Sequence, residues 1–478
     1  MRAPRLIAIL LATATAAAAA RPAAAWETST HVGLAEQAGL AADLDGVLRQ
    51  LGWRGGLFEP LVIPPEDAPT LLAALALHSA SDGFVPDIRG QQYALGWLLA
   101  GAALADATPG WAANHFLDPS SGAGWRGSGD LAAKLAGRAP TPGRGVPAVE
   151  WITAADNPLG LAGFLDQYGK AQTAATPGER ARAMAGALVA AGALLHVLAD
   201  MAAPSHVRGA RADQDEVVDI ATGERGARLD RLTAIAFGRL GVPAPRAVIN
   251  APTLRGFFVD TAGPDGAVAT PGLASWTASH FFSPATLPRP VPAGRLPRER
   301  LAQALTAALR RPAPVVPARL SLLTAGQPEG ATLRDDHKVC LARYRVERGL
   351  LSWSLDDDCQ IEQAQAILPV AAGYEAGLLR WLFRGELELR AGDGGVIAAS
   401  TRGLALGAGS LTLLAEDGRG VRTVVSTTAV SAAADGVALA SATMPAGTRR
   451  AVAVFRGVDG AGEQVVAVGL LDQVRVGP

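Results

Sequence analysis

The stretch that decides the fold is LLHVLADMAAPSH, residues 194–206, which closes a long alanine-rich apolar run. The run predicts a helix over 179–202, yet its end carries His196, Asp200 and His206. A polar side chain in an apolar core costs about 1–3 kcal/mol unless it finds a partner. His196 and Asp200 are four residues apart and therefore leave one face of a helix together. Two interpretations follow: a hydrogen-bonded pair within the core, or a metal site, which the addition of His206 favours.

The N-terminus has the pattern of a secretory signal peptide. Arg2 and Arg5 precede an apolar run that ends in the small residues 23–25. A charged start, an apolar middle and a small-residue cleavage site are typical of export signals. A membrane anchor is the alternative, but no second long apolar run follows. We predict cleavage near Ala25, a mature chain that begins at Trp26, and a secreted or periplasmic location.

Length and patterning predict two domains after the signal peptide. With 478 residues the chain is long for one compact domain. Residues 26–385 show mostly helical apolar spacing, whereas residues 386–478 consist of short runs rich in Val, Leu and Thr with Gly and Asp between them. We expect a mainly α protein, in which a multi-helix bundle precedes a small immunoglobulin-like β-sandwich. Helices are predicted over 30–52, 91–106, 179–202, 226–241 and 360–385, the last kinked or divided by Pro369.

Charge and cysteine content limit the function classes. The net charge is −1 and only three lysines occur, which argues against a strongly basic clamp for nucleic acid. Cys340 and Cys359 are the only cysteines. In an oxidising compartment they can form one disulfide, and two separate buried thiols are the alternative.

Other potential metal ligands lie in two further segments. His115 follows Asp106 in the segment after the predicted 91–106 helix, and His31 lies five residues after Trp26. Cleavage before Trp26 would create a free amine that can chelate a cation together with the carbonyl group of that residue. Zinc takes imidazole nitrogen and carboxylate oxygen as ligands, usually four per structural site. The set suffices for two ions if one carboxylate bridges them.

These motifs resemble the superfamily of zinc-dependent phospholipases C and single-strand-specific zinc nucleases. The resemblance is carried by the mature N-terminal tryptophan with its early histidine, by the Asp…His-Phe-x-Asp-Pro segment, and by His-x-x-x-Asp-x-x-x-x-x-His. It implies that Trp26 and His31 hold one zinc ion, with Asp200 as the bridging ligand. It also implies that Asp106, His115 and His196 hold the neighbouring ion with Asp200.

The sequence departs from this family at the third metal site. His206 would begin that site, but the segment after it, residues 207–230, contains no histidine. If the spacing after His206 is compared with the phospholipase pattern without gaps, the acidic ligand of the third site falls at Glu224. Asp213, Asp215 and Asp219 are alternatives. A solvated acidic loop is the other interpretation. We therefore expect two zinc ions, with a third left open.

The resemblance predicts a zinc-dependent phosphodiesterase of the phospholipase C type. Asp106 would position the attacking water or accept its proton. The ungapped position of Glu224, the short spacing from Asp106 to His115 and the few lysines favour a phospholipid substrate over a nucleic acid. The alternatives are a single-strand-specific nuclease and a non-catalytic, metal-stabilised protein that binds a surface. We expect a monomer whose β-domain contacts a membrane or a cell surface.

Overall fold

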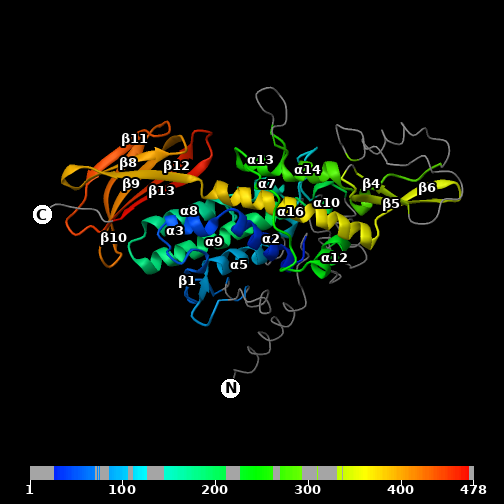
Figure 1. Cartoon of the computed structure of the whole chain (residues 1–478), viewed down its shortest axis with the longest axis horizontal. Coiled ribbons are helices and arrows are strands. Elements are labelled where there is room, and N and C mark those ends of the chain that lie inside the picture. The colour runs from blue at the N-terminus through cyan, green and yellow to red at the C-terminus, as the bar shows by residue number, and fades with distance from the viewer. Residues whose placement is uncertain are drawn as a thin grey trace, which may run out of the picture.

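The computed structural model describes residues 26–69, 71, 73, 75, 86–105, 111–125, 145–210, 227–261, 270–292, 309, 331–335 and 337–472. Figure 1 shows an elongated molecule with its helices in the middle. The C-terminal strands form one end of the molecule, and a smaller sheet, β4 to β6, lies at the opposite end. The long helices α9 and α16 both run through the helical part.

The helical part of the described chain is built from helices that differ widely in length. In chain order they are α2 (Thr28–Ala41), α3 (Leu44–Gln50), α5 (Ala94–Leu104), α7 (Ala148–Trp151), α8 (Leu161–Thr173), α9 (Pro177–Asp200), α10 (Pro204–Val207), α12 (Arg228–Ala236), α13 (Leu254–Phe258), α14 (Leu273–His280) and α16 (Asp357–Leu382). Single 3-10 turns lie at Gly56–Phe58, Ala112–Asn114, Pro284–Thr286 and Asp393–Gly395. A short antiparallel pair joins β1 (Pro60–Val62) to β2 (Gln91–Tyr93).

Helix α9 is the central helix, because most of its side chains are small or apolar and buried. Its start is fixed by Thr176, whose backbone N–H donates to the Glu179 carboxylate at 3.0 Å and whose hydroxyl accepts from the Glu179 N–H at 3.3 Å. This reciprocal capping box satisfies backbone donors that a helix start leaves open. Among the described helices, α9 alone is long and apolar enough to cross a membrane, but 94% of its apolar window is buried. It is therefore the core helix of this bundle.

Helices α5 and α9 approach each other closely at two glycines. A Cβ atom on Gly192 would lie 2.0 Å from the carbonyl oxygen of Leu98, and one on Gly101 would lie 2.0 Å from that of Val189. Any side chain at these positions would force the two helices apart, so glycine is required by the close approach rather than by a turn. The contact also sets the position of the neighbouring Ala102 carbonyl, which reaches the site described below.

Helix α16 continues through Pro369, so the predicted division at this proline is wrong. Proline removes a backbone donor and clashes with the preceding turn, which costs a helix about 3 kcal/mol. In this chain the proline is buried, and the helix packs against α2 and α9. Tertiary packing therefore outweighs the local preference.

The C-terminal strands form one seven-stranded sheet in the order β10-β9-β12-β13-β7-β8-β11. Their bounds are β7 (Gly385–Ala391), β8 (Val396–Arg402), β9 (Leu406–Glu416), β10 (Arg422–Val430), β11 (Ala438–Thr443), β12 (Arg450–Asp459) and β13 (Gln464–Asp472). A β-region at the C-terminus is what the sequence predicts. The strands form one hydrogen-bonded sheet through the short parallel pairing of β7 with β13, and β10 and β11, at the two ends of the strand order, contact each other, so the sheet folds over onto itself as the two layers of a sandwich do. Leu387 and Ile397 from β7 and β8 share a core with Leu411 and Phe455 from β9 and β12.

A second, four-stranded sheet interrupts the helical pattern that the sequence predicts before residue 386. Its strands are β3 (Val291–Pro292), β4 (Ala331–Arg334), β5 (Cys340–Glu347) and β6 (Leu350–Ser354), in the order β3-β6-β5-β4. In β5, residues 342–347 alternate apolar and charged side chains, which is a strand signal that the expectation of a helical part overlooked. A disulfide joins Cys340 on β5 to Cys359 on α16. The interpretation as two separate thiols is therefore wrong.

The large sheet is joined to the helices by buried arginines. The Nε atom of Arg422, at the start of β10, lies 2.8 Å from the carboxylate of Glu416, and its guanidinium also donates to the Gln172 carbonyl of α8. The backbone N–H of Arg422 donates to Ala175 at 2.9 Å. Arg180 on α9 donates to the Gly420 carbonyl at 2.8 Å. These bonds hold the sheet to the ends of α8 and α9.

We expect Arg422→Ala to lower the free energy of unfolding by about 3 kcal/mol, because it leaves the Glu416 carboxylate buried beside fewer cations. Urea unfolding followed by circular dichroism measures the change. The control is Arg390→Ala, which removes an exposed pair with Glu388 and is expected to leave stability nearly unchanged, because solvent screens that pair. Equal losses in the two variants would show that the Arg422 contacts do not hold the sheet in place.

Candidate metal centre

The end of α9 brings His196 and Asp200 to one face of the helix, inside the protein. Both side chains are buried, and Asp200 has no exposed surface. The helix ends at Asp200, and Pro204 begins the short helix α10 after a turn. Two polar residues one helical turn apart thus lie where α2, α5 and α16 pack against α9.

The orientation of the His196 ring is set by helix α5. Its Nδ1 atom lies 2.7 Å from the carbonyl oxygen of Ala102. A carbonyl oxygen only accepts hydrogen bonds, so this contact assigns the proton to Nδ1. In the neutral ring, Nε2 then presents its lone pair, and Nε2 lies 3.5 Å from the Oδ2 atom of Asp200. A lone pair that faces a buried carboxylate requires a proton or a cation between the two atoms.

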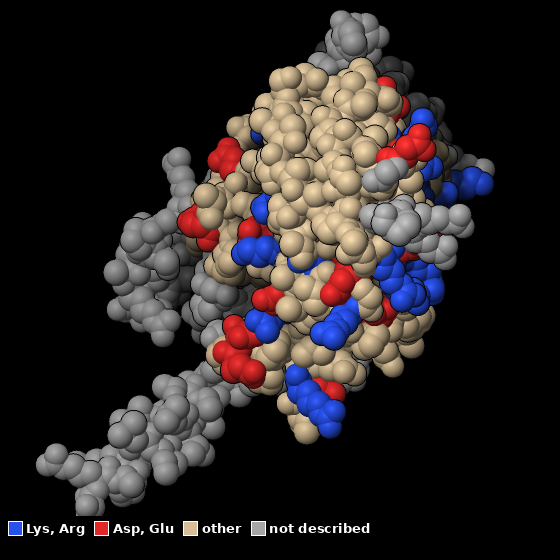
Figure 2. Space-filling view, turned by 90° about the vertical axis from the view of Figure 1, so that its left-hand side faces the viewer, with Lys and Arg blue, Asp and Glu red and all other residues tan. Residues whose placement is uncertain are grey.

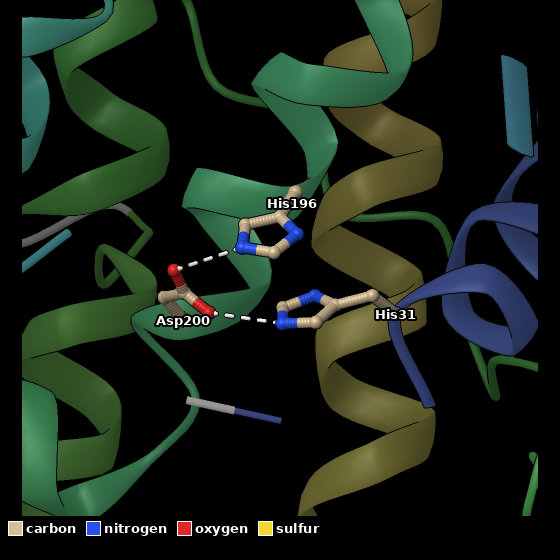
Figure 3. A group of neighbouring side chains, drawn as sticks. All are labelled: His31, His196 and Asp200. Carbon is tan, nitrogen blue, oxygen red and sulfur yellow. Dashed lines mark ion pairs between the residues drawn. The ribbon is translucent and has the colours of Figure 1, made fainter. Parts of the chain in front are cut away.

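The carboxylate of Asp200 is the centre of the group. Its Oδ1 atom lies 3.2 Å from Nε2 of His31, and its Oδ2 atom lies 2.8 Å from Nδ1 of His115. Figure 3 shows His31 and His196 pointing toward Asp200 from α2 and α9. The rings of His31 and His196 are stacked, with centroids 3.6 Å apart and an angle of 12° between their planes. The three histidines come from segments far apart in the sequence, so only the folded chain forms this group.

The histidines keep Asp200 ionised in the core. Burial opposes the charged form and would raise its pKa, but the positive charge of His196 and His31 when they are protonated and the hydrogen bonds from His115 and His31 outweigh this, so the pKa of Asp200 lies below its usual range. The site therefore offers a fixed negative charge among nitrogen ligands. That is the electrostatic arrangement a divalent cation requires.

The residues fit a metal ion. Ligand atoms of His31, His196 and Asp200 all lie within 4.8 Å of one another, and all three residues are buried. Imidazole nitrogen and carboxylate oxygen are ligands that zinc prefers. A histidine that binds a metal almost always donates its other ring N–H to a carboxylate, a carbonyl or water, as His196 does to Ala102. The group therefore has the composition, burial and spacing to hold a metal ion.

The other predicted ligands of the described chain lie beside this group. Trp26 is fully buried, and its indole N–H donates to the carbonyl oxygen of Ala199 at 3.0 Å, one residue before Asp200. The ring of His206 stacks on Phe116, with centroids 4.2 Å apart. The carbonyl oxygen of His206 accepts from the N–H of Leu117 at 3.1 Å. His206 thus lies against the segment that carries His115, and it is not one of the clustered ligands His31, His196 and Asp200.

Two predicted ligands lie outside the described residues. Asp106 and Glu224 are both in segments that the structure does not describe. The assignments of Asp106 to the metal pair and of Glu224 to a third site therefore stay predictions.

Two buried acids were missed by the sequence analysis. Asp230, in the first turn of α12, and Glu375, in the middle of α16, have no exposed surface. Burial raises the pKa of the Glu375 carboxyl well above its usual range, and the negative charge of Asp200 raises it further. A signal was present for Glu375, because it is the only charged residue in the segment PVAAGYEAGLL, residues 369–379. Acids are almost never fully buried unless they are paired or bind a ligand.

Comparisons with known proteins give weak similarities only. No model of a known protein family matches the chain, and no curated protein matches it. Among solved structures the chain is similar to the alpha toxin from Clostridium absonum, with 11% identity, 94% of each chain covered and a TM-score of 0.27. It is also similar to the alpha-toxin of Clostridium perfringens isolated from avian strain SWCP, with 10% identity, 95% of this chain and 100% of that chain covered, and a TM-score of 0.22. Likeness at this level is too weak to transfer a fold or an activity.

We expect Asp200→Asn to lower zinc affinity by about 100-fold or more, because it removes the only ionised oxygen ligand of the group of three. Competition with a chromogenic chelator measures the affinity, and circular dichroism checks that α9 persists. The control is Asp166→Asn, which removes an exposed acid paired with Lys170 on α8. Unchanged zinc binding by Asp200→Asn would rule out Asp200 as a ligand.

Proposed function

We propose that this protein is a zinc-dependent phosphoric diester hydrolase of the phospholipase C type. The observation that supports this most strongly is the contact between Asp200 and three imidazoles, in which the lone pair of His196 faces the carboxylate at 3.5 Å. A buried acid among histidines is suited to hold divalent ions and thereby to bind phosphate. The family resemblance of the motifs adds the reaction class.

The proposed ligand set contains two zinc ions that share Asp200. His31, together with the amine and carbonyl groups of a mature N-terminal Trp26, would hold one ion. His115, His196 and Asp106 would hold the second. The burial of Trp26 next to Ala199 supports its part in this set. His206 and Glu224 are proposed for a third site.

The proposed chemistry is attack of water on a phosphodiester. Bound zinc polarises a phosphoryl oxygen and lowers the pKa of water. Asp106 is proposed to orient the attacking water and to accept its proton. Asp200 holds the imidazoles of His31, His115 and His196 in one place, while the apolar helices around the group exclude bulk water. A rigid site of this kind positions the phosphate without rearrangement.

A phospholipid is the substrate we favour over a nucleic acid. Seen from the end formed by the C-terminal sheet, the upper part of the molecule carries few charged side chains, and acidic and basic side chains are mixed below it (Figure 2). Val424 and Val437 are 58% and 45% exposed in this sheet region. Proteins that bind nucleic acid rely on basic surfaces to neutralise phosphates, whereas uncharged surfaces suit contact with lipid. We also propose secretion or export to the periplasm after cleavage near Ala25, with the sheet region contacting a membrane or cell surface.

The first test is hydrolysis of bis-p-nitrophenyl phosphate by the purified mature chain, with Asp200→Asn as the inactive reference. We expect zinc-dependent turnover that chelation abolishes. Active protein is then assayed in parallel on phosphatidylcholine vesicles and on single-stranded DNA. Faster release of phosphocholine supports the phospholipase, and faster degradation of DNA supports the nuclease. Bound zinc without any turnover would contradict the proposed enzyme and favour a metal-stabilised binding protein.

A second prediction concerns the mature N-terminus. One additional residue before Trp26 should lower turnover by about 10-fold or more, because it converts a ligating amine into a peptide group. Proteolytic removal of that residue should restore the rate, which separates this effect from misfolding. An extended protein with undiminished turnover would remove the terminal amine from the ligand set.

A further inference from the structure

Glu375 is a buried carboxyl group to which neither the sequence motifs nor the proposed ligand set assigns a role. It lies in the middle of α16 and has no exposed surface. Neither of its carboxylate oxygens has a hydrogen-bond partner within the part of the chain that the structure describes. An acid in this state costs free energy, because nothing replaces the water it loses on burial. A buried acid without a hydrogen-bond partner therefore indicates a role for its charge or its proton.

The packing of α16 sets the face of the helix on which Glu375 lies. A Cβ atom on Gly373 or Gly377 would meet the carbonyl oxygens of Ala247 and Ile249, so this face of the helix packs against that segment. Residues two positions away lie about 200° around a helix, so Glu375 faces the opposite side. Helices α2 and α9, which carry His31 and Asp200, are the long helices packed against α16. Figure 3 shows α16 passing beside the three side chains of the centre.

Electrostatics agree with this placement. Asp200 lies close enough to Glu375 for its negative charge to act on the Glu375 carboxyl. Two like charges in an apolar core repel each other, so both acids can be ionised only if positive charge lies near them. Divalent ions that share Asp200 and are otherwise held mainly by neutral ligands keep an excess of positive charge. A further carboxylate beside them reduces that excess.

We propose that Glu375 is a charge-balancing acid beside the metal centre, outside the group of ligand atoms that lie within 4.8 Å of one another, and that it supplies further negative charge to the zinc ions that share Asp200. The proposal rests on the metal centre of the proposed function and is independent of the substrate. If Glu375 served only to fill space, glutamine would replace it without loss, since the two side chains have nearly the same shape. The two roles therefore differ in how zinc binding responds to Glu375→Gln.

The experiment measures zinc affinity by chelator competition, using zinc chloride and metal-free full-length mature chain. We expect Glu375→Gln to lower the affinity by about 10- to 100-fold, while urea unfolding of the metal-free variant shows no loss of stability. Glu375→Asp keeps the negative charge but shortens the side chain, so its zinc affinity should lie between that of Glu375→Gln and that of the unmodified protein. The control is Glu36→Gln on α2, an acid paired with Arg239 at 2.7 Å, which should leave zinc affinity unchanged.

The possible outcomes separate this proposal from the proposed function. Equal zinc affinity of Glu375→Gln and the unmodified protein would overturn the role of Glu375 and leave the metal centre intact. An unmodified protein that binds no zinc would overturn both. Zinc binding that depends on Glu375 in a protein without turnover would support the role of Glu375 and contradict only the hydrolase.

Discussion

The contact between His196 and Asp200, fixed from behind by the Ala102 carbonyl, is the constraint on which the centre depends. Helix periodicity places the two side chains on one face. The bond from Nδ1 to Ala102 then assigns the lone pair of Nε2 to the side that faces Asp200. The lone pair and the carboxylate oxygen repel each other unless a cation or a proton lies between them. The rest of the bundle brings His31 and His115 to the same carboxylate.

The polar side chains of the centre lose their contact with water inside an apolar bundle, which costs free energy. The packing of α5 against α9 limits this cost. Gly101 and Gly192 let α5 and α9 approach until a main-chain carbonyl reaches the ring of His196. A main-chain acceptor cannot be lost by mutation of a side chain, so the tautomer is determined by helix packing itself. Buried groups held in this way lose little freedom when a ligand binds. The apolar helices around them strengthen every charge interaction, because water is excluded.

The sheet region and the centre are connected through the same helices. Helix α9 begins near the buried arginines that hold the C-terminal sheet and ends at Asp200. Helix α16 passes the centre, and Arg384, just beyond its end, donates to Asp459 of β12 at 2.9 Å. The distance between the sheet and the metal centre is therefore set by rigid helices rather than by a linker.

The features that depend on local periodicity could be predicted from the sequence. The helical run before Pro204, the change to strands near residue 386 and the pairing of His196 with Asp200 all follow from spacing. Contacts that depend on the packing of distant segments could not be predicted from the sequence. Examples are the contact of the Ala102 carbonyl with the His196 ring and the position of Glu375. The prediction at Pro369 was wrong, because a local rule was outweighed by tertiary packing. The sheet formed by β3 to β6 was missed although residues 342–347 alternate apolar and charged side chains, because the helical pattern of the neighbouring segments was extended over this stretch.

The most direct test of the central claim is a crystal structure of the zinc-soaked mature chain, with diffraction data collected on both sides of the zinc absorption edge. We expect anomalous density beside the carboxylate of Asp200, within bonding distance of the imidazoles of His31 and His196. A peak found only at surface residues, with an empty centre at full zinc occupancy elsewhere, would contradict the account.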